Sequence, residues 1–294
     1  MKKPVLTFVS ILLLGSSLFY SCSGKEAKDV KPGVIVSILP QAYFAERLAG
    51  ERLNVSVLVG PGQSPHSWEP SPRQMAELAG ASIWFTIGVE FEKALKPKAA
   101  SLYKNLKISD TTAGINYRML EAHAHEDGEE EESGPDQHIW LGREQVKTVT
   151  NNMYKAIVAM DPSGEAVYRS NKEQFIKDID NIFDKMSQQL EPLRGSSAFV
   201  FHPAFGYLLD DLGLKQQAVE IGGKEPTQKT LATLIEKARA EKARVIFVQA
   251  QFPAGAAKAV ANAIDGTVVS IDPLARDWLH NLEHIALELD KGLK

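Results

Sequence analysis

Four side chains of this 294-residue sequence could together hold a metal ion. They are three histidines and one aspartate, found in four short segments: His66 in GPGQSPHSWEP, His138 in DQHIWL, His202 in FHPAFGY and Asp272 in IDPL. Three of the four stand next to a proline, which restricts the local backbone and lowers the entropy that a ligand loses on binding. Three neutral imidazoles and one carboxylate suit tetrahedral Zn²⁺, at distances of about 2.0–2.2 Å.

Each of these residues also has a purely structural interpretation. A single histidine beside a proline turn often only forms a hydrogen bond within the fold. An aspartate before a proline is a routine residue of turns and helix starts. Ligands this far apart in sequence form no short regular motif such as HExxH, so their spacing cannot decide the matter. The residues alone leave both a structural role and a metal site open.

The elements that must position these residues alternate between strands and helices. Short apolar runs rich in β-branched residues predict four strands in the first half, at 34–39, 55–59, 83–88 and, more weakly, 106–108. Stretches with helical spacing, such as 41–49 and 73–79, lie between them. This alternation is typical of a parallel sheet covered by helices on both faces.

The second half repeats the alternation after one long helix. Its predicted strands lie at 198–201, 245–248 and 267–271, and its predicted helices at 227–241 and 274–289. The long helix has a suitable start at Asp161-Pro162-Ser163 and an apolar period near 3.6 residues. About 28 residues at 1.5 Å each give a length of about 42 Å, enough to run along both halves.

The predicted fold class is therefore α/β, with two lobes that each hold a mainly parallel sheet flanked by helices. The predicted bounds are 33–160 for the N-terminal lobe, 161–194 for the rigid connecting backbone helix and 195–294 for the C-terminal lobe. In open α/β sheets, ligands bind beyond the carboxyl ends of the strands. His66, His202 and Asp272 follow predicted strands, and each half supplies two candidates, so the cleft between the lobes is the expected site.

Charge and the start of the chain bear on where the protein works. The sequence has 33 basic and 37 acidic side chains, a net charge of −4, and no basic cluster that would bind nucleic acid. Residues 1–21 are predicted to be a lipoprotein signal peptide, because two lysines precede an apolar stretch too short to span a bilayer. Cys22, the only cysteine, is the candidate lipidation site, and 22–32 would form a polar tether. The expected location is the periplasm or the cell surface, with the lipid as membrane anchor.

Six motifs run in order along the chain from about Val34 to the C-terminus: PGQSPHSWEP, DQHIWL, FHPAFGYL, EIGGKEPTQKTL, IFVQAQF and IDPL. In this combination the chain resembles the metal-binding lipoproteins of bacterial ABC-type zinc and manganese importers, the cluster A-I solute-binding proteins. The resemblance implies two α/β lobes joined by a rigid backbone helix. It also implies a metal site formed by His66, His138, His202 and Asp272.

The same resemblance implies that Zn²⁺ is the transported ligand. Manganese-selective members tend to have a glutamate where this chain has His202, and carboxylates favour harder ions. His202 therefore favours zinc, and manganese or iron is the alternative cargo. The resemblance also implies an importer permease and a separate ATPase as partners. The sequence has no phosphate-binding Gly-Lys-Ser/Thr loop, so this chain is not expected to hydrolyse ATP itself. A monomer is expected. Glu220 and Gln249 are candidates for orienting an imidazole.

The same residues could also serve two other classes of protein, a zinc hydrolase and a surface adhesion protein. A zinc hydrolase would keep one metal position open for water and would have a nearby general base. Asp272 would fill that position here and no HExxH motif supplies a base, so we expect no enzyme. A surface adhesion protein could use the metal only structurally, and a metal that can be removed with the fold intact would argue against it.

The segment 121–136, EAHAHEDGEEEESGPD, sets His123 and His125 beside six acidic residues. It cannot bury apolar surface, so we expect a loop. It resembles the His-rich acidic loop of zinc-dedicated family members but has only two histidines. A solvated run of charge and a weak auxiliary metal collector both fit it.

Overall fold

The computed structural model divides the chain into residues 1–30 and residues 31–294. The structure describes residues 31–120, 134–220, 228–252 and 255–294. The predicted signal peptide, Cys22, most of the tether and both loop histidines, His123 and His125, lie outside the described residues. Predictions that concern them are therefore untested by the structure.

The first sheet has four parallel strands in the order β2-β1-β3-β4. They are β1 (Gly33–Val36), β2 (Asn54–Val57), β3 (Ile83–Thr86) and β4 (Lys107–Asp110). Three helices alternate with them: α1 (Leu39–Ala49), α2 (Pro72–Gly80) and α3 (Phe91–Leu102). The central strand β3 is buried along its whole length, as expected for a parallel sheet covered on both faces.

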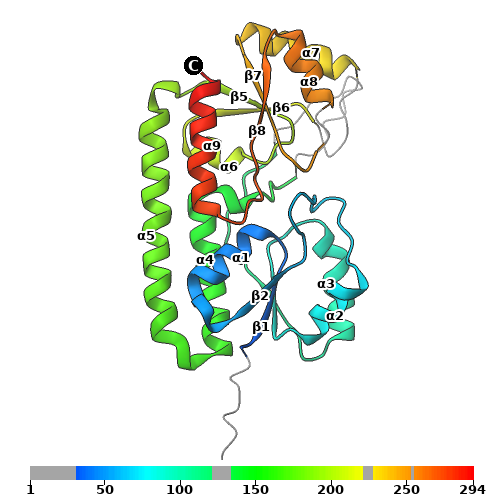
Figure 1. Cartoon of the computed structure of the whole chain (residues 1–294), viewed down its shortest axis with the longest axis vertical. Coiled ribbons are helices and arrows are strands. Elements are labelled where there is room, and N and C mark those ends of the chain that lie inside the picture. The colour runs from blue at the N-terminus through cyan, green and yellow to red at the C-terminus, as the bar shows by residue number, and fades with distance from the viewer. Residues whose placement is uncertain (1–30, 121–133, 221–227, 253–254) are drawn as a thin grey trace, which may run out of the picture. The chain divides into compact units, whose positions relative to one another are not determined.

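The second sheet repeats this order with four parallel strands, β6-β5-β7-β8. They are β5 (Ser197–Val200), β6 (Lys215–Ala218), β7 (Val245–Val248) and β8 (Thr267–Ser270). The helices that alternate with them are α6 (Gly206–Asp211), α7 (Gln228–Ala240) and α8 (Gly255–Ala263). Two parallel sheets flanked by helices confirm the predicted fold class (Figure 1).

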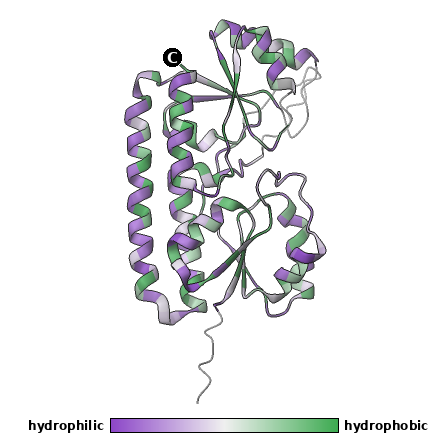
Figure 2. Ribbon diagram, in the orientation of Figure 1, coloured by the Kyte–Doolittle hydropathy of each residue, from purple (hydrophilic) through white to green (hydrophobic). Residues whose placement is uncertain are grey.

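Three longer helices complete the unit: α4 (Arg143–Met160), α5 (Glu165–Leu190) and α9 (Trp278–Gly292). The helix α5 is the predicted long connecting helix, and it packs against α1, α4 and α9 (Figure 1). Its hydrophilic and hydrophobic residues alternate in bands along its length (Figure 2). Such banding is the pattern of a helix that buries one stripe.

An aromatic cluster on α5 joins helices that accompany the two sheets. The ring centroid of Phe175 lies 5.7 Å from that of Phe44 on α1 and 6.3 Å from that of Trp278 on α9. Phe44 and Trp278 also meet edge to face at 5.3 Å. Core residues of both sheets belong to the same buried hydrophobic cluster. The domain bounds at 160/161 and 194/195 thus stay a prediction, because packing is continuous across them.

The strand β6 and the start of α9 are among the elements that differ from the sequence prediction. The strand β6 has the polar sequence Lys-Gln-Gln-Ala, so its existence depends on parallel pairing with β5 and not on its own apolar pattern. The last helix begins at Trp278 instead of 274, because the backbone N–H of Leu274 donates to Asp272 Oδ1 in a local turn. Within the described ranges, no helix is both long and apolar enough to cross a membrane.

Candidate metal centre

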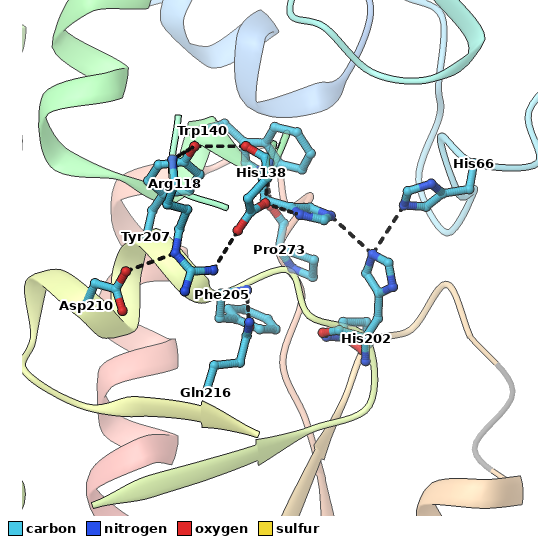
Figure 3. A network of polar contacts seen from close by, with 12 residues as sticks. His66, Arg118, His138, Trp140, His202, Phe205, Tyr207, Asp210, Gln216 and Pro273 are labelled. Atoms are coloured by element: carbon cyan, nitrogen blue, oxygen red, sulfur yellow. Dashed lines mark hydrogen bonds and ion pairs between the residues drawn. The ribbon is translucent and has the colours of Figure 1, made fainter. Parts of the chain in front are cut away.

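Three histidines from distant parts of the chain point their Nε2 atoms at one spot (Figure 3). His66 comes from the loop between β2 and α2, His138 directly precedes the short 3₁₀ turn Ile139–Leu141, and His202 follows β5 by two residues. The Nε2 atom of His202 lies 3.2 Å from that of His66 and 3.1 Å from that of His138. The corners of a tetrahedron around Zn²⁺ with Zn–N bonds of about 2.0–2.1 Å are about 3.3–3.4 Å apart. The ring positions therefore match ligands of one ion.

The three rings line a small cavity of about 30 Å³. Trp140, Phe252 and Pro65 form much of its apolar wall. Its size leaves room for a water-sized occupant, which fits an ion. The side chains of His138 and His202 are 9% and 7% exposed, whereas that of His66 is 39% exposed. An ion would therefore reach the cavity from the His66 side.

Buried carboxylates fix the orientation of two of the imidazoles. The Nδ1 atom of His138 lies 2.8 Å from Asp136 Oδ1, and that of His202 lies 2.7 Å from Glu220 Oε2. A carboxylate only accepts hydrogen bonds, so each Nδ1 carries the hydrogen and each Nε2 presents a lone pair. Burial would raise the pKa of Asp136, but its bonds with His138 and Arg118 hold that pKa below its usual range. Both rings thus have the tautomer that metal binding requires.

Gln249 orients His202 through the backbone. Its Oε1 accepts from the His202 N–H at 3.1 Å and its Nε2 donates to the His202 carbonyl at 2.8 Å. The predicted partner Glu220 is confirmed as the residue that contacts the ring, while Gln249 holds the main chain instead. His66 is less constrained, because Glu90 Oε2 stands 3.6 Å from its Nδ1 and is itself exposed.

The lowered pKa values of two of the histidines favour metal binding at neutral pH. Burial lowers the pKa of both His66 and His202. The neighbouring imidazole lowers each pKa further, and together these effects outweigh the raising effects of Glu90 on His66 and of Glu220 on His202. Neutral imidazole is the form that coordinates a metal. With their hydrogens on Nδ1, His138 and His202 bring two lone pairs together at 3.1 Å, an arrangement that a cation between them would relieve.

Asp272 does not join the three histidines in the described structure. One oxygen of its carboxylate accepts hydrogen bonds from Leu274 N and from Gln251 Nε2, both at 2.8 Å. Asp272 lines a separate cavity beside Leu39 and Arg276, whereas Gln251 lines the histidine cavity. Its role as the fourth ligand therefore stays a prediction.

The structure adds residues that the sequence analysis did not single out as partners. Asp136 stands two positions before His138 in the DQH motif, and that short spacing was the available signal. The ring of Phe252 stacks on His202 with centroids 4.6 Å apart. Arg118 donates to Asp136 Oδ2 at 2.9 Å. The contacts of Phe252 and Arg118 depend on tertiary packing that no local pattern encodes.

The fold and the three converging imidazoles define a two-lobed metal-binding protein. The chain belongs to the ZnuA family, described as zinc-uptake complex component A, periplasmic, whose profile matches residues 34–292. A crystal structure of ZnuA is 32% identical with a TM-score of 0.82, covering 90% of this chain and 99% of that one. Its family places this chain among metal-binding components and not among enzymes.

Two relatives show the range of sequence similarity. The zinc-binding lipoprotein AdcA of Streptococcus pneumoniae is 26% identical over 272 residues, covering 90% of this chain and 53% of that protein. The chain thus spans about half the length of AdcA. The high-affinity zinc uptake system protein ZnuA of Bacillus subtilis is 26% identical over 288 residues, covering 91% of this chain and 84% of that protein.

The pair formed by His202 and Glu220 leads to a prediction of two losses of zinc affinity, a larger one and a smaller one. We expect His202→Ala to lower the affinity for Zn²⁺ by orders of magnitude, because one of three converging nitrogens is lost. Glu220→Gln keeps the shape but removes the charge behind the ring, so we expect a loss of about 10–100-fold. Competition with a chromogenic chelator measures both, and far-UV circular dichroism should stay unchanged. The exposed Glu191→Gln is the control, and a Glu220→Gln protein that binds as tightly as this control would contradict the assignment.

Proposed function

We propose that this protein captures Zn²⁺ outside the cytoplasm as the solute-binding component of an ABC-type importer. It would deliver the ion to a membrane permease driven by a separate ATPase. The observation that carries the proposal is the convergence of three Nε2 atoms, two of them fixed by buried carboxylates. Family membership and relatives named as zinc-binding proteins support the same conclusion.

We propose His66, His138, His202 and Asp272 as the ligand set. The three imidazoles would receive the ion first, since their nitrogens already lie at near-tetrahedral spacing. Asp272 would then give up its hydrogen bond with Gln251 and coordinate the metal as the fourth ligand. A closed four-ligand shell leaves no position for a reactive water, in keeping with a carrier of zinc.

Zinc is preferred over manganese because the donors that face the cavity are mainly imidazoles. Imidazole suits zinc, whereas carboxylate and carbonyl oxygens suit manganese. The two buried carboxylates stand behind the rings at Nδ1 and do not face the ion. One relative, a lipoprotein of Streptococcus anginosus that is 23% identical over 254 residues, is named as a manganese transporter component. Manganese is therefore the alternative cargo.

The proposed location follows from the start of the chain. Lipidation of Cys22 would anchor the protein in the periplasm or at the cell surface. Residues 22–32 would then tether the folded unit to the membrane. We propose that the protein is a monomer. The metal would be cargo, so its removal should leave the fold intact, which distinguishes this role from adhesion with a structural metal.

Competitive titration of the metal-free protein tests the proposed cargo. We expect one Zn²⁺ per chain and an affinity for Zn²⁺ that exceeds the affinity for Mn²⁺ by at least a factor of ~100, since Irving–Williams order and imidazole donors act in the same direction. Isothermal calorimetry with each metal, followed by displacement, gives both values. Equal or tighter binding of Mn²⁺ would move the assignment to the alternative cargo.

The pH dependence of binding tests the state of the imidazoles. Protons compete with zinc for Nε2, and the pKa values of His66 and His202 lie below their ordinary value of 6.5. We therefore expect affinity to be retained as pH falls from 7.5 toward 6.5 and to fall steeply below that range. Chelator competition at a series of pH values measures this. A large loss already between pH 7.5 and 6.5 would mean that the rings accept protons more readily than their burial implies.

The acidic segment can be removed without cutting the parts that support His138. The N–H of Leu120 donates to Gly134 O at 3.0 Å and that of Asp136 donates to Arg118 O at 2.8 Å, so Leu120 and Gly134, which flank 121–133, lie next to each other. We expect deletion of 121–133 with a short turn in its place to leave high-affinity zinc binding intact. Asp136→Asn is the contrasting variant and should weaken binding by about 10–100-fold. Loss of high-affinity binding on deletion would show that the segment contributes to it.

A further inference from the structure

Arg118 contacts both the carboxylate that supports His138 and the helix α6 that follows His202, although none of its hydrogen bonds or ion pairs goes to the three rings. Its Nη1 donates to Asp136 Oδ2 at 2.9 Å and its Nε donates to Asp210 Oδ2 at 2.9 Å (Figure 3). Asp136 is fully buried and supports His138, whereas Asp210 lies on α6, the helix that begins four residues after His202. The guanidinium therefore links the segment of His138 to the segment of His202.

The two oxygens of Asp136 are divided between the histidine and the arginine. Oδ1 accepts from the backbone N–H of His138 at 3.0 Å and from its Nδ1 at 2.8 Å, while Oδ2 accepts from Arg118. This division fixes the rotation of the carboxylate and, through it, the plane of the His138 ring. Without Arg118, one oxygen of a fully buried carboxylate would lose its charged partner.

Tyr207 reinforces the same connection through the backbone. Its hydroxyl donates to the Asp136 carbonyl at 2.8 Å and accepts from the Arg118 N–H at 3.0 Å. Tyr207 is on α6 beside Asp210, so α6 holds the Arg118–Asp136 pair at three points.

Gly206 makes this arrangement possible. A Cβ atom at position 206 would lie 1.8 Å from Arg118 Nη1 and 2.9 Å from Asp136 Oδ2. The guanidinium thus lies directly on the first turn of α6, in space that any side chain would fill. The glycine is required by this close approach and not by its backbone angles, because its φ is not positive.

We propose that Arg118 is a positioning residue for metal binding: it fixes Asp136 against α6 and so holds His138 at the distance from His202 that one ion needs. The inference rests on the proposed function, since it assigns Arg118 a part in zinc capture. It explains how Nε2 atoms from separate segments come to lie 3.1 Å apart. A site ordered in advance loses less entropy on binding.

Arg118→Met tests the proposal with three measurements. We expect zinc affinity to fall by about tenfold or more, mainly through faster dissociation, since partners behind a ligand contribute effects of this size. The visible absorption of bound Co²⁺ should change in position or intensity, because ligand geometry changes. In the metal-free protein, the backbone amide of His138 should exchange its hydrogen faster, because it donates to the loosened Asp136.

Two further variants and a control make the result specific. Arg118→Lys should recover part of the affinity, because it keeps the charge but not both hydrogen bonds. Gly206→Ala should reproduce the loss with Arg118 chemically intact, and it decides the question if Arg118→Met fails to fold. Arg52→Met is the control: Arg52 donates to Asp161 and Tyr168, away from the histidines, so it should lower stability and leave zinc binding unchanged.

The outcomes separate this proposal from the function on which it rests. Zinc binding by the wild type, with unchanged affinity and Co²⁺ spectra in both Arg118→Met and Gly206→Ala, would overturn the role of Arg118 alone. A wild-type protein that binds no zinc would overturn the proposed function and this inference with it. Parallel losses in the two variants, absent from Arg52→Met, would support the positioning role.

Discussion

The metal centre depends on an unfavourable contact that the fold enforces. Asp136 and Glu220 keep the hydrogens of His138 and His202 on Nδ1, so two lone pairs face each other at 3.1 Å between buried rings. Buried polar atoms with no donor opposite them raise the free energy of the folded protein. A divalent cation converts that contact into coordination bonds. The pocket is therefore complementary to a divalent cation.

Rigid packing around the rings is what keeps this contact in place. The indole N–H of Trp140 donates to Pro273 O at 2.8 Å, and that of Trp278 donates to Trp140 O at 2.7 Å. These bonds join the turn after His138 to the segment of Asp272 and to the start of α9. The helix α5 then connects α9 with α1 through Phe175 and its aromatic neighbours. Relaxation of the rings would have to disturb this packing, which is close and buried.

Sequence patterns predicted the parts of this arrangement that local rules govern. Apolar runs located β1, β2, β3, β5, β7 and β8, and the ends of β2 and β5 then placed His66 and His202 near carboxyl ends of strands. The apolar period of α5 located the long helix. The resemblance to metal-binding lipoproteins implied the three histidines that the structure brings together.

Features that depend on tertiary contacts were beyond sequence patterns. The polar strand β6 exists because β5 offers it a partner, and the bond between Gln251 and Asp272 depends on two side chains meeting across loops. Arg118 stands 18 positions before Asp136, and only the folded chain shows that Gly206 leaves space for its guanidinium. Local propensity carries no information about such long-range contacts, which tertiary packing alone determines.

X-ray absorption spectroscopy of the protein loaded with one Zn²⁺ tests the central claim most directly. The account predicts a shell that contains three imidazole nitrogens at about 2.0–2.1 Å, with the outer-shell scattering typical of histidine rings. A spectrum with fewer than three imidazoles, or with a shell composed mainly of oxygen, would contradict it.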